Sequence, residues 1–414
     1  MTRSGDTVTT FREVFANSEF RAIFCGSGLS TAGDFLARGA VTIGVYTSSQ
    51  STALMAVTYA LTFLPDLIGG ALLSGFADRF SRRTVMVTAD LLRAVLVAVM
   101  ATSGLSLAVV WLLLLAVRLL DAPFRGAQAA TLSLVLTGDR YVVGTSANTM
   151  LANLAVGVGF TGAGAVVQQL GMNTALYVNA GTFICSALLI RFGVRSRPVT
   201  GPGTPQATRW WGSLAAGTRL VRADRRLRTL MSFAVIPGIC MVATALVAPY
   251  TVETGSTEAA AGALMGIGSA GMVIGVWALA RWMRPQTRMR LLGVLAAASA
   301  APFIVCAWHP GLVADAVIWF VNGAATCFWV PVTTGVVQST PEAMRGQMNG
   351  LVFALLRLVQ GTAILVYGLL AEVLPPSTVI AAAGLLGLVT SGVIGFAWRR
   401  VDTKPQSAAA DVSQ

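Results

Sequence analysis

The sequence predicts an all-α membrane protein with twelve transmembrane helices in two six-helix bundles. Of its 414 residues, 55% are hydrophobic and only 11% are charged, whereas a soluble globular protein carries about 25% charged residues. Apolar runs recur at the length of about 20 residues that a helix needs to cross a bilayer. The Lys and Arg residues between these runs all fall on one side when the runs are threaded alternately through a membrane.

Each apolar run is predicted to form one helix, because in lipid a helix satisfies its own backbone hydrogen bonds. The predicted spans are 20–47, 52–76, 84–104, 107–136, 145–170, 174–193, 229–252, 258–281, 290–308, 312–338, 347–373 and 377–398. The predicted domains are a cytoplasmic N-terminal segment (1–19), an N-terminal bundle (20–194), a cytoplasmic linker with an interfacial helix (195–228), a C-terminal bundle (229–398) and a disordered cytoplasmic tail (399–414).

The positive charges predict the orientation. Five of the 29 Lys and Arg residues lie well inside the runs, and the other 24 lie in connections or at the adjoining ends of runs, all on the same side. Positive residues mark the cytoplasmic side, so both termini are predicted to be cytoplasmic in a multi-pass protein of the cell (inner or plasma) membrane. This distribution explains the net charge of +12 without a nucleic-acid partner. The opposite, outer connections carry Glu253, Glu258, His309, Asp315 and Glu372.

Motifs for enzyme chemistry are absent from the sequence. It contains no Gly-x-x-x-x-Gly-Lys-Ser/Thr phosphate loop and no His-Glu-x-x-His pair. We therefore expect no enzyme activity, no cofactor and no metal. Paired six-helix halves are the architecture of many secondary transporters, whose substrate site lies at mid-membrane between the halves. A membrane receptor or scaffold with twelve spans would share the same helix count.

Charged residues inside the spans are the candidate functional residues, because each costs about 2.5 to 3.5 kcal/mol to insert into hydrocarbon. They are Asp34, Asp66, Asp90 and Asp121 with Arg38, Arg93, Arg118, Arg125 and Arg357. Most of these acids have an arginine three or four residues away, on the same face of the predicted helix: Asp34 has Arg38, Asp90 has Arg93, and Asp121 has both Arg118 and Arg125. This spacing favours local neutralisation, and Asp90 with Arg93 is interpreted as a supporting charge pair.

Asp66 differs from the other acids. The positions three and four residues away hold Thr62, Phe63, Gly69 and Gly70, which cannot neutralise it. It therefore needs a partner from another helix, or a proton, and the sequence leaves both alternatives open. A carboxylate that gains and loses a proton can couple transport to a proton gradient. Asp66 and then Asp34 are the candidate proton carriers.

A basic loop follows the second span. Residues 75–84 read Gly-Phe-Ala-Asp-Arg-Phe-Ser-Arg-Arg-Thr and combine Asp78 with three arginines, Arg79, Arg82 and Arg83. The loop resembles the Gly-x-x-x-Asp-Arg-x-Gly-Arg-Arg pattern between helices 2 and 3 of major facilitator superfamily transporters. It departs from that pattern twice, since Gly75 stands one position late and Ser81 replaces the second Gly. The resemblance implies that this loop takes part in the conformational switch of transport.

Further segments resemble the branch of this superfamily that includes the enterobactin exporter and macrolide efflux proteins. These segments are 30–34, 64–65, 89–93, 121–125, 147–148 and 224–230. The resemblance implies export of a small amphipathic molecule, a drug-like compound or natural product, by alternating access and proton antiport. It implies a monomer in the lipid bilayer and a role in drug resistance. The segment 157–164 lacks the Pro of the family's antiporter motif, which weakens the antiport inference. The alternatives are an importer or facilitator of the same fold, or a non-transporting receptor or scaffold.

Overall fold

The computed structural model describes residues 11–63, 65, 80–137, 139–197, 217–341 and 344–402. Every regular element in these ranges is a helix. The chain forms two compact units: unit 1 comprises Met1–Val41 and Ile68–Ala207, and unit 2 comprises Thr42–Leu67 and Thr208–Gln414. Residues 42–67, which by sequence belong to the predicted N-terminal bundle, thus cluster with the second half of the chain. The predicted domain limits remain a prediction.

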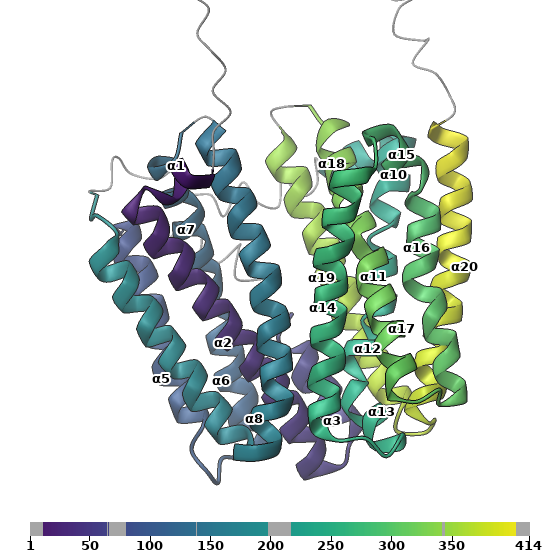
Figure 1. The fold of residues 1–414 in the computed structure, drawn as a ribbon, viewed down its shortest axis with the longest axis horizontal. Coiled ribbons are helices and arrows are strands. Elements are labelled where there is room, and N and C mark those ends of the chain that lie inside the picture. Colours follow the sequence, from purple (N-terminus) through teal and green to yellow (C-terminus); the bar gives the residue numbers. More distant parts are fainter. Residues whose placement is uncertain are drawn as a thin grey trace, which may run out of the picture. The chain divides into compact units, whose positions relative to one another are not determined.

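Unit 1 contains the first 24 residues of the long helix α2 and most of the helices up to residue 193 (Figure 1). Its helices are α1 (Phe11–Phe15), α2 (Ser18–Ser49, as far as Val41), α5 (Arg82–Met100), α6 (Leu107–Leu119), α7 (Asp121–Val135) and α8 (Asp139–Gly193). Helix α5 packs along α8, and small residues let α2 approach α8 closely. A Cβ added at Gly159 of α8, for example, would lie 2.5 Å from the backbone oxygen of Ala32.

Helix α8 contains two predicted spans, 145–170 and 174–193. Gly171 interrupts it with φ of 82° and ψ of 167°. Residues with a side chain rarely adopt a positive φ, whereas glycine does so without steric cost. The chain therefore turns at Gly171, between the two predicted spans.

Proline accounts for several other interruptions. Pro123 lacks an N–H and its ring clashes with the carbonyl four residues earlier, at Leu119, which is the last residue of α6. By the same geometry Pro237 follows the end of α10, and Pro249 lies four residues after Ala245, the end of α12. The predicted spans 107–136 and 229–252 are therefore built from consecutive helical pieces.

Unit 2 contains the end of α2 and the remaining helices. These are α3 (Thr52–Ala60), α10 (Arg225–Ser232), α11 (Val235–Cys240), α12 (Val242–Ala245), α13 (Val247–Glu253), α14 (Glu258–Trp282), α15 (Pro285–Arg290), α16 (Leu292–Ala300), η1 (Ala301–Trp308), α17 (Leu312–Ala325), η2 (Thr326–Phe328), α18 (Trp329–Gln338), α19 (Arg345–Leu370) and α20 (Pro376–Asp402). Helix α14 packs on α17, and α16 packs on α20. Gly275 permits the first contact, since a Cβ there would lie 2.1 Å from the carbonyl oxygen of Ala324.

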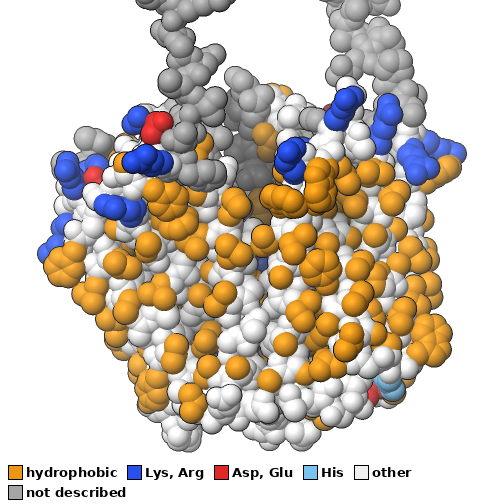
Figure 2. Space-filling view, viewed as in Figure 1, with side chains coloured by type: hydrophobic (Ala, Val, Ile, Leu, Met, Phe, Trp, Pro, Cys, Tyr) orange, Lys and Arg blue, Asp and Glu red, His pale blue; other side chains and the backbone are white. Residues whose placement is uncertain are grey.

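The surface of each unit suits a bilayer. Large apolar side chains such as Leu112, Val158, Trp277 and Val393 are exposed. Figure 2 shows hydrophobic side chains along the helices of each unit and Lys and Arg side chains gathered at one end. In the described part of the chain, seven helices are long and apolar enough to cross a membrane. Each of the twelve predicted spans contains at least one helical stretch among its described residues.

Glu19 joins the start of α2 to the segment that follows α8. Its carboxylate accepts hydrogen bonds from both terminal nitrogens of Arg197, at 2.8 and 2.9 Å, and from the backbone N–H of Arg195 at 3.2 Å. Burial raises the pKa of Glu19, but these hydrogen bonds and the two positive charges lower it more. The pKa of Glu19 therefore lies below its ordinary value of 4.5.

We expect this contact to stabilise unit 1 in a pH-dependent way. A carboxyl group whose pKa is lowered by folding stabilises the fold above its ordinary pKa, and the stabilisation is lost as the pH falls through the folded-state pKa. Acidification from about pH 7 to about pH 3.5 should therefore narrow the difference in thermal stability between the wild type and Glu19→Gln. Thermal unfolding in detergent at both pH values measures this difference, and a difference independent of pH would contradict the prediction.

Candidate functional site

Unit 1 contains a group of charged side chains between its helices, which we call the buried charge network. Its members are Asp34 on α2, Asp90 and Arg93 on α5, Arg118 on α6, and Asp121 and Arg125 on α7. All of them except Arg125 are buried. Four helices thus bring three carboxylates and three guanidinium groups together.

Arg93 lies at the centre of the network. Its Nη2 contacts Oδ1 of Asp90, one turn earlier on α5. Its Nη1 donates a hydrogen bond to Oδ1 of Asp121 at 3.1 Å and lies 4.0 Å from Oδ2 of Asp34. One guanidinium group is therefore shared by carboxylates from three helices, and movement of any of these helices changes its surroundings.

Two aromatic rings complete the environment of Arg93. Its guanidinium carbon lies 4.7 Å from the ring centre of Phe124 and 4.5 Å from that of Phe183. Such cation–π contacts stabilise a cation that has lost contact with water. The sequence did not identify either ring: Phe124 stands one turn from Asp121 within a charged stretch, and Phe183 has no charged neighbour that would have marked it.

Asp34 has ion-pair partners on other helices. Its Oδ1 lies 2.8 Å from Nη2 of Arg118, and Arg93 is its second partner. Arg38, which the spacing placed beside Asp34, is buried with its guanidinium 4.6 Å from the ring centre of Phe35. Contacts between helices therefore join Asp34 to the network.

Asp121 has partners on its own helix and on α5. Its Oδ2 accepts a hydrogen bond from Nε of Arg125 at 2.6 Å, at the four-residue spacing seen in the sequence. The side chain of Arg125 is 62% exposed, so it reaches from the buried carboxylate toward the surface of unit 1.

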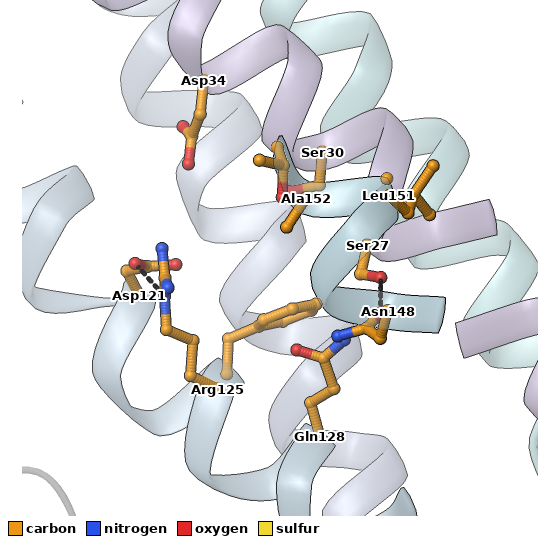
Figure 3. Close-up of a pocket in the computed structure, with 12 residues that line it drawn as sticks. Ser27, Ser30, Asp34, Asp121, Arg125, Gln128, Asn148, Leu151 and Ala152 are labelled. Atoms are coloured by element: carbon orange, nitrogen blue, oxygen red, sulfur yellow. Dashed lines mark hydrogen bonds and ion pairs between the residues drawn. The ribbon is translucent and has the colours of Figure 1, made fainter. Parts of the chain in front are cut away.

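A small polar cavity of about 80 Å³ adjoins the network (Figure 3). Helices α2, α7 and α8 line it with Ser27, Ser30, Asp34, Asp121, Arg125, Gln128, Asn148, Leu151 and Ala152, among others. The hydroxyl of Ser27 donates to the amide oxygen of Asn148 at 3.1 Å. A water molecule occupies about 30 Å³ in the liquid, whereas pockets for drug-sized ligands measure about 300 to 1,000 Å³. This cavity therefore has room for a few water molecules and is too small for a drug-sized ligand.

Of the remaining predicted site residues, the structure describes Arg357, Arg82 and Arg83. Arg357 lies in unit 2, on α19, where its guanidinium carbon is 5.2 Å from the ring centre of Phe63. Arg82 and Arg83 begin α5 and donate to the carbonyl oxygens of Ala130 at 2.8 Å and Val194 at 3.3 Å. The residues that lie outside the described part of the chain are Asp66, Gly75, Asp78 and Arg79.

Unit 2 has a buried acid that the sequence placed in an outer connection. Asp315 lies in the first turn of α17, is 2% exposed, and accepts a hydrogen bond from the hydroxyl of Tyr250 at 2.7 Å. The predicted span 312–338 begins where α17 begins, at Leu312, so counting Asp315 with the connection was wrong. The position of Asp315 at a span boundary concealed this burial, which depends on Tyr250 of a distant helix.

Comparisons with known proteins agree with this architecture. The family model for the Major Facilitator Superfamily matches residues 23–321. The solved structure of the nucleoside transporter NupG aligns with a TM-score of 0.74 and 14% identity, covering 92% of this chain and 99% of that chain. A POT family transporter in complex with 5-aminolevulinic acid gives 0.71 and 11%, covering 93% and 96%. A bacterial homologue of the human lysosomal transporter Spinster gives 0.68 and 13%, covering 92% and 97%. No curated protein sequence matches the chain.

Proposed function

Because the chain belongs to the major facilitator superfamily, and is therefore a multi-pass membrane transporter of the secondary type and not an enzyme, we propose that it exports a small amphipathic molecule by proton antiport. The predicted all-helical fold class is confirmed by the family match and the structural neighbours. The finer assignment to the branch of enterobactin and macrolide exporters rests on the sequence resemblance, which is strongest from residue 30 to residue 93.

The observation that supports proton coupling is the buried charge network beside the polar cavity. Its three carboxylates face three guanidinium groups, so its formal charges cancel. Adding one proton leaves an excess positive charge in an environment of low polarity, which is costly. A conformation that separates a carboxylate from its arginine would relieve this cost, so protonation would favour one state of the transporter over the other.

Of the three network acids, Asp34 and Asp121 line the cavity. Of the two proton carriers proposed from the sequence, Asp34 belongs to this network, and Asp66 lies outside the described residues. We propose that Asp66 carries the coupling proton, with Asp34 as the second candidate. Charges of the transport cavity are proposed to be Arg38, Arg118, Asp121, Arg125 and Arg357.

Transport by inside-out vesicles tests the proposal. In such vesicles the cytoplasmic face points outward, so an exporter should accumulate its substrate when a proton gradient, acidic inside, is imposed. We expect accumulation of at least one compound from a panel of macrolides, siderophore-like chelates and cationic dyes, and loss of that accumulation when a protonophore collapses the gradient. Vesicles without the protein provide the control.

The same panel distinguishes the alternatives. The structural neighbours are described as nucleoside and peptide transporters, so the panel should include nucleosides and short peptides. Accumulation only in right-side-out vesicles would replace the export proposal with import. Equilibration that ignores the gradient would indicate a facilitator.

A further inference from the structure

Glu372, two residues beyond the end of α19, binds the start of α3 within unit 2. Its Oε1 accepts hydrogen bonds from the hydroxyl of Ser51 at 2.6 Å and from the backbone N–H of Ala53 at 2.7 Å. The hydroxyl of Thr52 lies 3.2 Å from the same oxygen. The first N–H groups of a helix have no partner within the helix and carry partial positive charge. The Glu372 carboxylate therefore stabilises the start of α3 in two ways: it accepts a hydrogen bond from an N–H group of the first turn, and its negative charge faces the partial positive charge there.

The two helices pack closely below this contact. The hydroxyl of Thr52 donates to the carbonyl oxygen of Gly368 at 3.0 Å. A Cβ at Gly368 would lie 2.0 Å from the Cβ of Ala56, so only glycine permits this approach. Further along the chain, Tyr59 of α3 and Phe63, three residues beyond the end of α3, share an apolar cluster with Ile364 of α19.

In alternating access, the contact between Glu372 and the start of α3 would have to form and break. Residues 42–67 join the first predicted half of the chain to unit 2, and secondary transporters work by rocking one half against the other. The predicted outer ends of the two halves must separate at one stage of that cycle. The apolar contacts between α3 and α19 are spread over several residues, whereas three polar contacts converge on one carboxylate oxygen of Glu372.

We propose that Glu372 is a positioning residue that latches the outer end of the first half, through Ser51 and Ala53, to α19 and releases it when the outer side opens. The latch requires only that the chain transports by alternating access. It does not depend on the proposed substrate, on the direction of transport or on the coupling ion.

The chain offers a matched control in Glu253. Its carboxylate accepts hydrogen bonds from the backbone N–H of Ser377 at 2.9 Å and from the Ser377 hydroxyl at 2.6 Å, and lies 3.1 Å from Nε2 of His309. It thus binds the start of α20 much as Glu372 binds the start of α3. Glu253 and its partners Ser377 and His309 all lie in the second half of the chain. Loss of the Glu253 carboxylate should therefore weaken unit 2 without releasing the first half.

Distances between spin labels test the latch. The labels would be placed at Ser48 of α2 and Val313 of α17, both exposed, in a variant whose five cysteines are replaced. Pulsed electron paramagnetic resonance in lipid nanodiscs, without substrate or gradient, then gives the ratio of separated to closed populations. We expect Glu372→Gln to raise this ratio about threefold, because hydrogen bonds to a charged group become weaker neutral ones. The effect is moderate because Glu372 is exposed, so water competes for these bonds. Ser51→Ala should shift the ratio in the same direction by a smaller factor.

Two comparisons make the result decisive. Glu253→Gln should leave the ratio of separated to closed populations at its wild-type value. Glu372→Asp, which keeps the negative charge, should show a larger closed population than Glu372→Gln. An unchanged ratio in Glu372→Gln, or equal shifts in Glu372→Gln and Glu253→Gln, would overturn the proposal. Because no transport is measured, a failure of the export proposal would leave this result intact.

Discussion

Replacing Arg93 by methionine is expected to destabilise unit 1 by about 3 to 5 kcal/mol and to abolish transport. Arg93 is buried along its whole side chain, so methionine fills the space of the aliphatic stem and leaves the space of the guanidinium group empty. What it removes is the positive charge shared by Asp90, Asp121 and Asp34. Removing one partner of a buried ion pair is costly because the other partner keeps its charge in an environment without water.

Arg125→Met provides the matched control. It removes a guanidinium group from the same acid, Asp121, but the side chain of Arg125 is 62% exposed. Asp121 also keeps its hydrogen bond from Arg93 at 3.1 Å, so this variant should lose clearly less stability than Arg93→Met. Denaturant unfolding of both variants in micelles measures the difference. Equal stabilities of the two variants would show that the network does not depend on Arg93.

A compensated variant separates the loss of charge balance from the loss of packing. Arg93→Met combined with Asp90→Asn removes one positive and one negative charge, so the formal charges of the remaining network cancel again. Replacing both members of a buried ion pair with neutral groups is often nearly neutral for stability. The double variant should therefore be more stable than Arg93→Met alone. If it is not, the contacts of the guanidinium with Phe124 and Phe183 carry more of the stability than its ion pairs.

Asp66→Asn is expected to abolish gradient-driven accumulation while leaving substrate binding and downhill exchange largely intact. Coupling requires a carboxylate that is protonated in one conformation and ionised in the other. The sequence places no basic residue within one turn of Asp66, so a rearrangement of helices alone could alternate its surroundings between water and apolar packing. Asp34, by contrast, has a counter-charge in Arg118 at 2.8 Å, so its surroundings change only if that ion pair separates.

Vesicle assays compare Asp66→Asn with Asp34→Asn under an imposed proton gradient and without one. We expect Asp34→Asn to reduce accumulation and also to lower thermal stability, because it leaves Arg118 and Arg93 with one carboxylate fewer. If Asp66→Asn still drives uphill transport with the wild-type dependence on pH, Asp66 has a structural role. The assignment of the proton carrier would then move to Asp34.

Local geometry explains which features the sequence could predict. The pairing of Asp121 with Arg125 was readable from the four-residue spacing, because one helical turn brings such residues to the same face. The interruption at Gly171, between two predicted spans, and the helix breaks around Pro123 follow from backbone geometry that each residue carries with it. Membrane insertion and the candidate charges follow from composition, since hydrocarbon penalises every charge regardless of the fold. The family resemblance extended these local features to the whole chain.

Contacts between helices were decided by the tertiary structure alone. The ion pair of Asp34 with Arg118 depends on how α2 and α6 are rotated toward each other, which no spacing along either helix determines. The burial of Asp315 depends on the hydroxyl of Tyr250, 65 residues away. The contact of Glu372 with Ser51 joins positions 321 residues apart. Periodicity reports which side of a helix a residue occupies, whereas its partner across the gap depends on the crossing and rotation of both helices, which are set by packing over the whole unit.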